Sequence, residues 1–82
     1  MSLEETIGAA LRKEAREATG TDPGVPTRDT PLADTGLDSI GFATLIVELE
    51  NSLGVDPFGG SGDIVYPDSF GELVDLYAAA VR

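Results

Sequence analysis

The serine at position 39 is the residue of this sequence that is best placed for chemistry. Ser39 directly follows Asp38, and the two open a pattern that predicts a long amphipathic helix to about Leu53. A hydroxyl in this place faces solvent at the positive end of the helix dipole, where an attached phosphate group is favoured. The sequence contains no histidine to activate the hydroxyl, which excludes a self-sufficient hydrolytic nucleophile. Ser39 is therefore either an ordinary first-turn serine or a site that another enzyme modifies.

Other residue patterns that carry chemistry are missing or incomplete. The absence of cysteine and histidine excludes a disulfide framework, a Cys/His zinc site and a thiol nucleophile. The glycine-rich stretch 59–62 follows no predicted strand and lacks the Gly-Lys-Ser/Thr ending of a phosphate-binding loop. Asp56 and Asp63 flank this stretch without the carboxylate spacing of a calcium loop. These patterns argue against a nucleotide site and against a metal site.

The charge of the chain limits the partners that it can bind. Fifteen acidic residues oppose five basic ones, for a formal net charge of −10. This balance disfavours nucleic acid as a partner, because phosphate contacts need lysine and arginine. Between Asp29 and Val81 there are ten acids and no basic residue. We interpret the negative electrostatic field of these acids as a means of steering basic protein partners toward the chain. The other interpretation is that the acids only keep the protein soluble.

The length of 82 residues predicts one small domain that spans residues 1–82. No apolar run approaches the ~20 residues that cross a bilayer. The acidic segment 1–5 also differs from a signal peptide, which begins with basic and apolar residues. We therefore expect a cytoplasmic monomer that does not bind a membrane.

Capping signals and apolar spacing predict three main helices. Capping boxes open the first and last of them, Ser2 with Glu5 and Ser69 with Glu72, and Asp38 is the expected N-cap of the middle one. The predicted elements are a helix from Ser2 to Thr19, a helix from Ser39 to Leu53, ended by Gly54, and a helix that starts at Ser69. The predicted apolar faces are Leu3, Ile7, Ala10, Leu11 and Ala18; Phe42, Leu45, Ile46, Leu49 and Leu53; and Phe70, Leu73, Val74, Tyr77, Ala80 and Val81.

The segments between these helices are rich in proline and glycine. Prolines recur through the segment from Thr21 to Leu37, and prolines this frequent cannot lie inside a helix. We expect an ordered loop there, because Val25, Leu32 and Leu37 can pack onto the helices. Residues 55–67 have room for one short helical turn at most, around 63–66. The predicted fold class is an all-α bundle of three main helices and one short third helix, with a long ordered loop after the first.

The residues around Ser39 carry a resemblance to a known family. Thr35-Gly36-Leu37-Asp38-Ser39-Ile40, followed by the apolar stripe and then Gly54-Val55, closely resembles the phosphopantetheine attachment region of acyl and peptidyl carrier proteins. In that family a Gly-x-Asp-Ser-Leu-like motif begins the second helix of a four-helix bundle. The likeness extends over the whole chain in helix order, size and acidity, and it implies the four-helix carrier fold.

This resemblance implies a function for the serine. Ser39 would receive 4'-phosphopantetheine from CoA through a phosphopantetheinyl transferase that acts with a divalent metal. The thiol of the arm would hold an acyl or aminoacyl group as a thioester and pass it between loading and downstream biosynthetic enzymes. Asp38 would position the transferase and its metal, and the chain itself would catalyse no reaction. The residues expected to contact partner enzymes are Ile40, Gly41, Thr44, Val47 and Glu48.

The sequence departs from the family pattern at several of these positions. Fatty-acid carriers typically place acids two and five residues after the serine, where this chain has Gly41 and Thr44, and Val47 follows at position eight. The linker from Asp56 to Asp68 also differs from their compact acidic third helix. We therefore favour a free-standing carrier of polyketide or nonribosomal peptide biosynthesis, with the choice of acyl or aminoacyl cargo open. The alternative function is an acidic helical adaptor that binds a basic protein without being modified.

Overall fold

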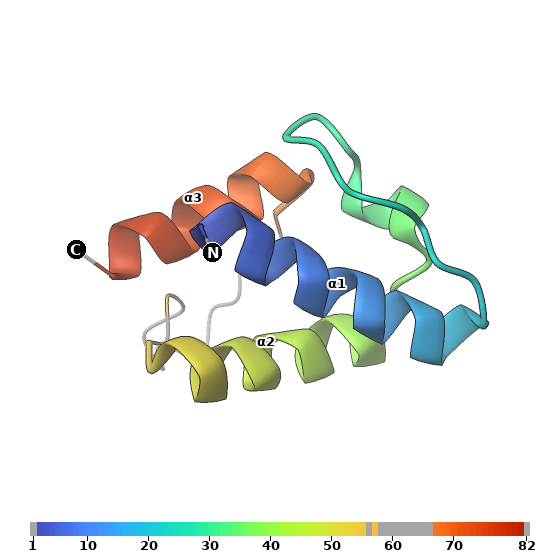
Figure 1. The fold of residues 1–82 in the computed structure, drawn as a ribbon, viewed down its shortest axis with the longest axis horizontal. Helices are drawn as coiled ribbons and strands as arrows, with labels where there is room; N and C mark the ends of the chain where they lie inside the picture. The colour runs from blue at the N-terminus through green and yellow to red at the C-terminus, as the bar shows by residue number, and fades with distance from the viewer. Residues whose placement is uncertain (1, 56, 58–66, 82) are drawn as a thin grey trace.

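The computed structural model describes residues 2–55, 57 and 67–81, and in these residues the chain is helical (Figure 1). The elements are α1 (Leu3–Thr19), the short 3₁₀ helix η1 (Leu32–Thr35), α2 (Ser39–Leu53) and α3 (Phe70–Ala80). The three predicted main helices are confirmed, and the described residues contain no strand beyond an isolated bridge between Pro31 and Ser69. The short helical turn expected around 63–66 lies outside the described residues.

The helix starts follow the capping residues that the sequence indicates. Ser2 accepts a hydrogen bond from the backbone N–H of Glu5, and the Glu5 carboxylate accepts one from the N–H of Ser2. Ser69 likewise accepts from the N–H of Glu72 at 3.2 Å. The carboxylate of Glu72 accepts from the N–H of Asp68, at 2.7 Å, one residue before the position that a standard capping box uses. Side chains thus satisfy backbone donors that the first turns leave without partners.

The helix α1 packs against both α2 and α3, and Figure 1 shows it running between them, antiparallel to α2. Two predicted positions lie outside the core, because Ala18 and Val81 are exposed, the latter at the residue that ends α3. The buried face of α1 passes through Glu14 and Ala15 instead. None of the described helices is long and apolar enough to cross a bilayer. The buried hydrophobic residues are Ile7, Leu11, Ala15, Leu32, Phe42, Leu45, Leu49, Phe70, Leu73, Val74 and Tyr77.

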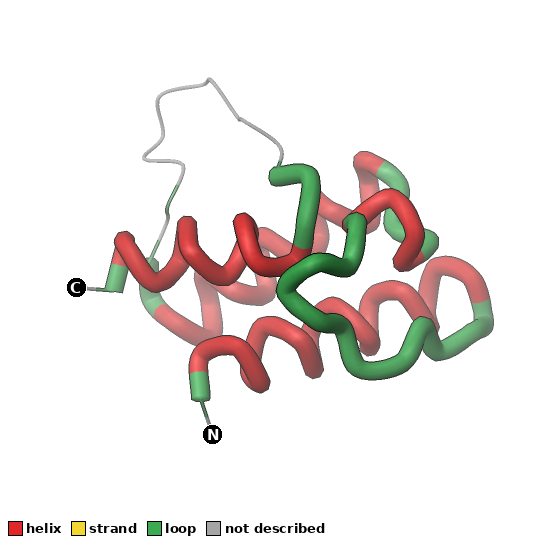
Figure 2. The backbone as a smooth tube through the Cα atoms, turned by 90° about the horizontal axis from the view of Figure 1, so that it is seen from above, coloured by secondary structure: helices red, strands yellow, loops and turns green. Residues whose placement is uncertain are grey.

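The segment between α1 and α2 crosses the helices as a loop that is hydrogen-bonded to the start of α3 (Figure 2). The N–H of Phe70 donates to the carbonyl of Thr30 at 2.9 Å, and the N–H of Gly71 donates to the carbonyl of Arg28 at 3.0 Å. A Cβ on Gly71 would lie 2.8 Å from that carbonyl oxygen, so this approach requires glycine. The loop therefore completes the N-terminal cap of α3.

The packing of this loop corrects one expectation from the sequence. Leu32 is buried and Leu37 is half-buried, as their expected role requires. Val25 is 78% exposed and does not pin the loop. The start of the loop is held on α1 by ion pairs between charged side chains, and not by the apolar side chain of Val25 as expected.

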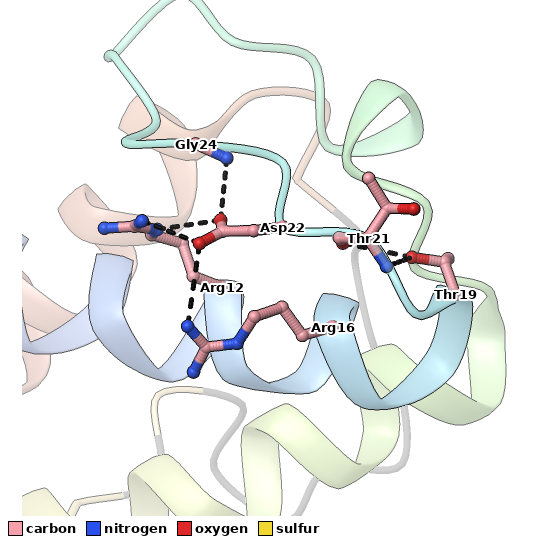
Figure 3. A network of polar contacts seen from close by, with 6 residues as sticks. All are labelled: Arg12, Arg16, Thr19, Thr21, Asp22 and Gly24. Carbon is pink, nitrogen blue, oxygen red and sulfur yellow. Dashed lines mark hydrogen bonds and ion pairs between the residues drawn. The ribbon is translucent and has the colours of Figure 1, made fainter.

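An ion-pair network around Asp22 fastens the loop to α1 (Figure 3). The Asp22 carboxylate accepts two hydrogen bonds from Arg12, at 3.0 and 2.8 Å, and lies 3.6 Å from Arg16. It also accepts one from the N–H of Gly24 at 2.8 Å. The hydrogen bonds from Arg12 and Gly24 lower the pKa of Asp22 to about 2.

Candidate functional site

The start of α2 is built by the residues on either side of Ser39. Asp38 is the N-cap, with extended backbone, and its Oδ1 accepts a hydrogen bond from the N–H of Gly41 at 2.7 Å. The carbonyl of Asp38 accepts from the N–H of Phe42 at 2.9 Å. Ser39 is the first helical residue and is exposed. The hydroxyl-bearing residue is thus held at a capped helix end and remains accessible from solvent.

Three of the expected partner-contact residues lie on the outer face of α2. Ile40 is 76% exposed and Val47 is 56% exposed, which is unusual for branched apolar side chains on a helix. Thr44 is exposed, and its hydroxyl donates to the carbonyl of Ile40 at 3.1 Å. We call Ile40, Thr44 and Val47 the outer face of α2. Their spacing of four and three residues aligns them along one side of the helix that begins at Ser39.

The structure places the fourth expected contact residue, Gly41, in a packing role. Gly41 is half-buried, and a Cβ on it would lie 2.9 Å from the side chain of Leu37 and 3.3 Å from Oδ1 of Asp38. Glycine at this position lets Leu37 turn inward and lets the Asp38 carboxylate reach the helix end. Gly41 therefore supports the geometry around Ser39 and does not belong to the outer face of α2.

The fifth expected contact residue, Glu48, is turned toward α1. Its carboxylate forms an ion pair with the ammonium group of Lys13 at 3.0 Å, and this pairing raises the pKa of Lys13. Glu14 is buried beside it. Burial raises the pKa of Glu14, and the hydrogen bond and charge of Glu48 and the charge of Glu17 raise it further. Glu48 thus takes part in the contact between α1 and α2.

A cavity of about 280 Å³ adjoins Ser39, and no motif in the sequence predicted it. It lies between η1, the first turn of α2 and Pro67, and its apolar lining includes Leu32, Leu37 and Phe42. The only sequence signal for it was the pair of apolar residues, Leu32 and Leu37, expected to pack the loop onto the helices. The cavity gives the serine an apolar neighbour on the inner side of the helix start.

Comparison with known families identifies the kind of site that this is. A family described as "Phosphopantetheine attachment site" matches residues 9–57, which is more than half of the chain. The chain belongs to this family. The matched stretch includes most of α1, the loop, η1 and all of α2, and therefore the capped serine. Neither the curated proteins nor the solved structures gave a match to this chain.

Membership of the phosphopantetheine attachment family makes this chain a carrier domain. Such domains bear covalent 4'-phosphopantetheine, are generally non-catalytic, and work with a transferase and with biosynthetic enzymes. The start of α2 fits such a group, because it presents an exposed hydroxyl at a helix N-terminus beside an apolar cavity.

Proposed function

We propose that Ser39 is the attachment residue for 4'-phosphopantetheine in this carrier. The observation that carries the proposal is the position of Ser39 as the exposed first residue of the capped helix α2, within the stretch that matches the family. The serine hydroxyl attacks the phosphorus of CoA next to the pantetheine. The pyrophosphate bond breaks, adenosine 3',5'-bisphosphate leaves, and the serine proton passes to the transferase.

The helix end contributes to this attachment in a simple electrostatic way. The product is a phosphodiester with one negative charge, and the N-terminus of α2 places that charge at the positive end of a helix dipole. This interaction is worth about 0.3–1 kcal/mol at an exposed site. Asp38 already satisfies the N–H of Gly41, so the cap holds before and after modification. We infer that Asp38 also helps to position the transferase and its metal.

The outer face of α2 is the surface that we assign to partner enzymes. Ile40 and Val47 present exposed apolar area on the helix that begins at Ser39, and the whole chain carries a net charge of −10. An acidic body attracts basic enzymes from a distance, and a small apolar contact lets each of them release it. The arm then raises the local concentration of its cargo at each active site. The protein acts in this proposal as a cytoplasmic, monomeric carrier without turnover of its own.

The residues that follow Ser39 in α2 favour polyketide or nonribosomal peptide biosynthesis over fatty-acid synthesis. Gly41 and Thr44 stand where fatty-acid carriers typically have acids, and Val47 follows. Isolation of the loaded protein from its source cells, followed by mass measurement of the released thioester, tests this. A ketoacyl or aminoacyl cargo agrees with the proposal, and a saturated fatty acyl series contradicts it.

The attachment itself is tested by intact mass after incubation with CoA and a broad-specificity phosphopantetheinyl transferase. Wild-type protein should gain one phosphopantetheine, and Ser39→Ala should gain none. Ser52→Ala is the matched control, because Ser52 is an exposed serine in the same helix, and it should load like wild type. A folded wild-type protein that gains no mass would contradict the proposal and favour the alternative function, an unmodified acidic adaptor.

Variants of Asp38 separate its capping role from its role in modification. Asparagine caps a helix about as well as aspartate, so Asp38→Asn should unfold within about 0.5 kcal/mol of wild type. Its rate of phosphopantetheine transfer should fall, because the carboxylate is gone. Asp38→Ala loses the cap as well and should be destabilised by about 1 kcal/mol. An Asp38→Asn variant that loads at the wild-type rate would limit Asp38 to the cap.

A further inference from the structure

The last residue of α1 contacts the turn that leads into Ser39. Gly36 follows η1 and has a φ of +87°, in the left-handed region that glycine adopts readily. A Cβ on Gly36 would lie 2.7 Å from Cγ2 of Thr19, the residue that ends α1. The methyl group of Thr19 therefore packs against the backbone of Gly36, three residues before Ser39, although the whole loop separates the two along the chain.

The hydroxyl group of Thr19 sets the direction of this methyl group. Thr19 Oγ1 donates a hydrogen bond to the carbonyl of Ala15 at 2.8 Å, and it accepts one from the N–H of Thr21 at 3.1 Å (Figure 3). The bond to the preceding turn selects the χ1 rotamer of the threonine, and the bond from Thr21 ties it to the start of the loop. Rotation of the side chain away from Gly36 would break both bonds.

The other contacts of the turn before Ser39 are local. Thr35 is buried, and its hydroxyl donates to the carbonyl of Leu32 at 2.6 Å. Leu37 packs against Gly41, where a Cβ would lie 2.9 Å from the leucine side chain. These contacts join residues that are three or four positions apart, so they fix the shape of the turn itself. The methyl contact of Thr19 differs, because it ties the turn to another helix.

We propose that Thr19 is a positioning residue for the attachment reaction, whose methyl group holds the turn at Gly36 so that the Ser39 hydroxyl meets the transferase in one orientation. The proposal rests on the proposed function, because it takes Ser39 as the residue that is modified. A carrier whose turn samples other orientations has a smaller binding-competent fraction, so the transferase binds it more weakly. Once bound, the serine is held by the enzyme, and the rate at saturation is unchanged.

The first test measures phosphopantetheine transfer from saturating CoA, with the carrier as the varied substrate. Thr19 is exposed, so its variants leave the core intact. Thr19→Ser keeps the hydroxyl and loses the methyl group, and it should raise the KM for the carrier by about two- to fourfold at an unchanged kcat. Thr19→Val keeps the methyl group and loses the hydroxyl, so it should melt at a lower temperature than wild type and keep the wild-type KM.

The matched control for the loss of the methyl group is Thr6→Ser. Thr6 also lies in α1, and its hydroxyl donates to the carbonyl of Ser2, four residues earlier, at 3.0 Å. This variant should keep the wild-type KM. A Thr19→Ser variant with the wild-type KM, or a Thr19→Val variant whose KM rises as much as that of Thr19→Ser, would overturn the proposal.

The second test needs no transferase and uses the amide chemical shifts of the ¹⁵N-labelled, unmodified protein. Thr19→Ser should shift the resonances of Gly36, Leu37 and Ser39, and Thr6→Ser should leave them in place. If wild-type protein is folded and accepts no phosphopantetheine, the proposed function fails and the role of Thr19 in it fails too. If wild-type protein is loaded and Thr19→Ser leaves the resonances of the turn unshifted, the positioning role alone is overturned.

Discussion

The outward surfaces of α1 and α2 differ in what their side chains contact. On α1, Arg12 and Arg16 pair with Asp22 of the loop, and Lys13 pairs with Glu48 of α2. On α2, the outer face presents two exposed apolar side chains, Ile40 and Val47. The charged surface of α1 is therefore used within the molecule, whereas the outer face of α2 is open to other molecules.

The two sides of α2 itself also differ in their burial. Its inner side carries Phe42, Leu45 and Leu49, which are buried in the core. Its outer face adds apolar residues that the fold does not bury. A helix with one apolar face is the ordinary amphipathic pattern, and a second exposed apolar face indicates an interaction surface.

The largest effect is expected on the inner side of α2. Leu45 is fully buried, and Leu45→Ala should lower the free energy of unfolding by about 2–5 kcal/mol. Denaturant unfolding measures this loss. Ile40→Ala is the matched control on the outer face of the same helix and should change stability by less than about 0.5 kcal/mol. A Leu45→Ala variant with wild-type stability would invalidate the assigned core side.

A smaller effect is expected from the charged residue on the inner side of α1. The pKa of Glu14 is raised in the folded state, so protonation of Glu14 favours folding. Its stabilising contribution is complete below the pKa of the unfolded chain and is lost as the pH rises through the raised folded pKa. Glu14→Gln should therefore be more stable than wild type at neutral pH and lose this part of the pH dependence. Unfolding curves at a series of pH values give the free energy of unfolding of both proteins. The prediction is refuted if the difference between wild type and Glu14→Gln is the same at every pH.

The outward network of α1 should respond to pH in the opposite direction. The pKa of Asp22 is about 2 in the fold, below its ordinary value, so its ion pairs stabilise the protein above the pKa of the unfolded chain. This contribution is lost as the pH falls toward 2. In Asp22→Asn, the melting temperature should no longer show this part of its fall as the pH is lowered toward 2. Asp34→Asn, at an exposed aspartate of η1, is the control. An unchanged acid profile in Asp22→Asn would show that the network contributes little to stability.

The smallest effect on stability is expected on the outer face of α2. Val47→Asp should change the free energy of unfolding by less than about 0.5 kcal/mol, because the side chain is more than half exposed. The same variant should slow cargo transfer by partner enzymes while phosphopantetheine loading at Ser39 still goes to completion. A large loss of stability would place Val47 in the core and remove the distinction between the two sides of the helix.

The parts of this structure that the sequence predicted are those that depend on neighbours along the chain. Helix starts at Ser2, Asp38 and Ser69 depend on residues within one turn, and apolar spacing located most of the core. The contact of Glu14 with Glu48 depends on how two helices face each other. Sequence spacing does not specify that orientation, so the ion pair of Glu48 with Lys13 was not predicted.

In the candidate site, too, the sequence predicted the local features and not the features formed by distant segments. Asp38 and Ser39 form a local signal, since a cap and the following hydroxyl need only each other. The cavity beside them needs η1 and Pro67, which meet only in the folded chain. Val25 is a second example, because the sequence alone does not reveal whether an apolar loop residue packs inward or is exposed, as Val25 is.

The carbonyls of Arg28 and Thr30, which cap the first turn of α3, have a consequence for building chimeric carriers. A crossover point inside the loop would join one parent's carbonyls to another parent's helix, whose residue at position 71 need not be glycine. The loop and α3 therefore form a unit that should be exchanged together. The exposed residues of α2 belong to no such unit and can be transplanted one by one.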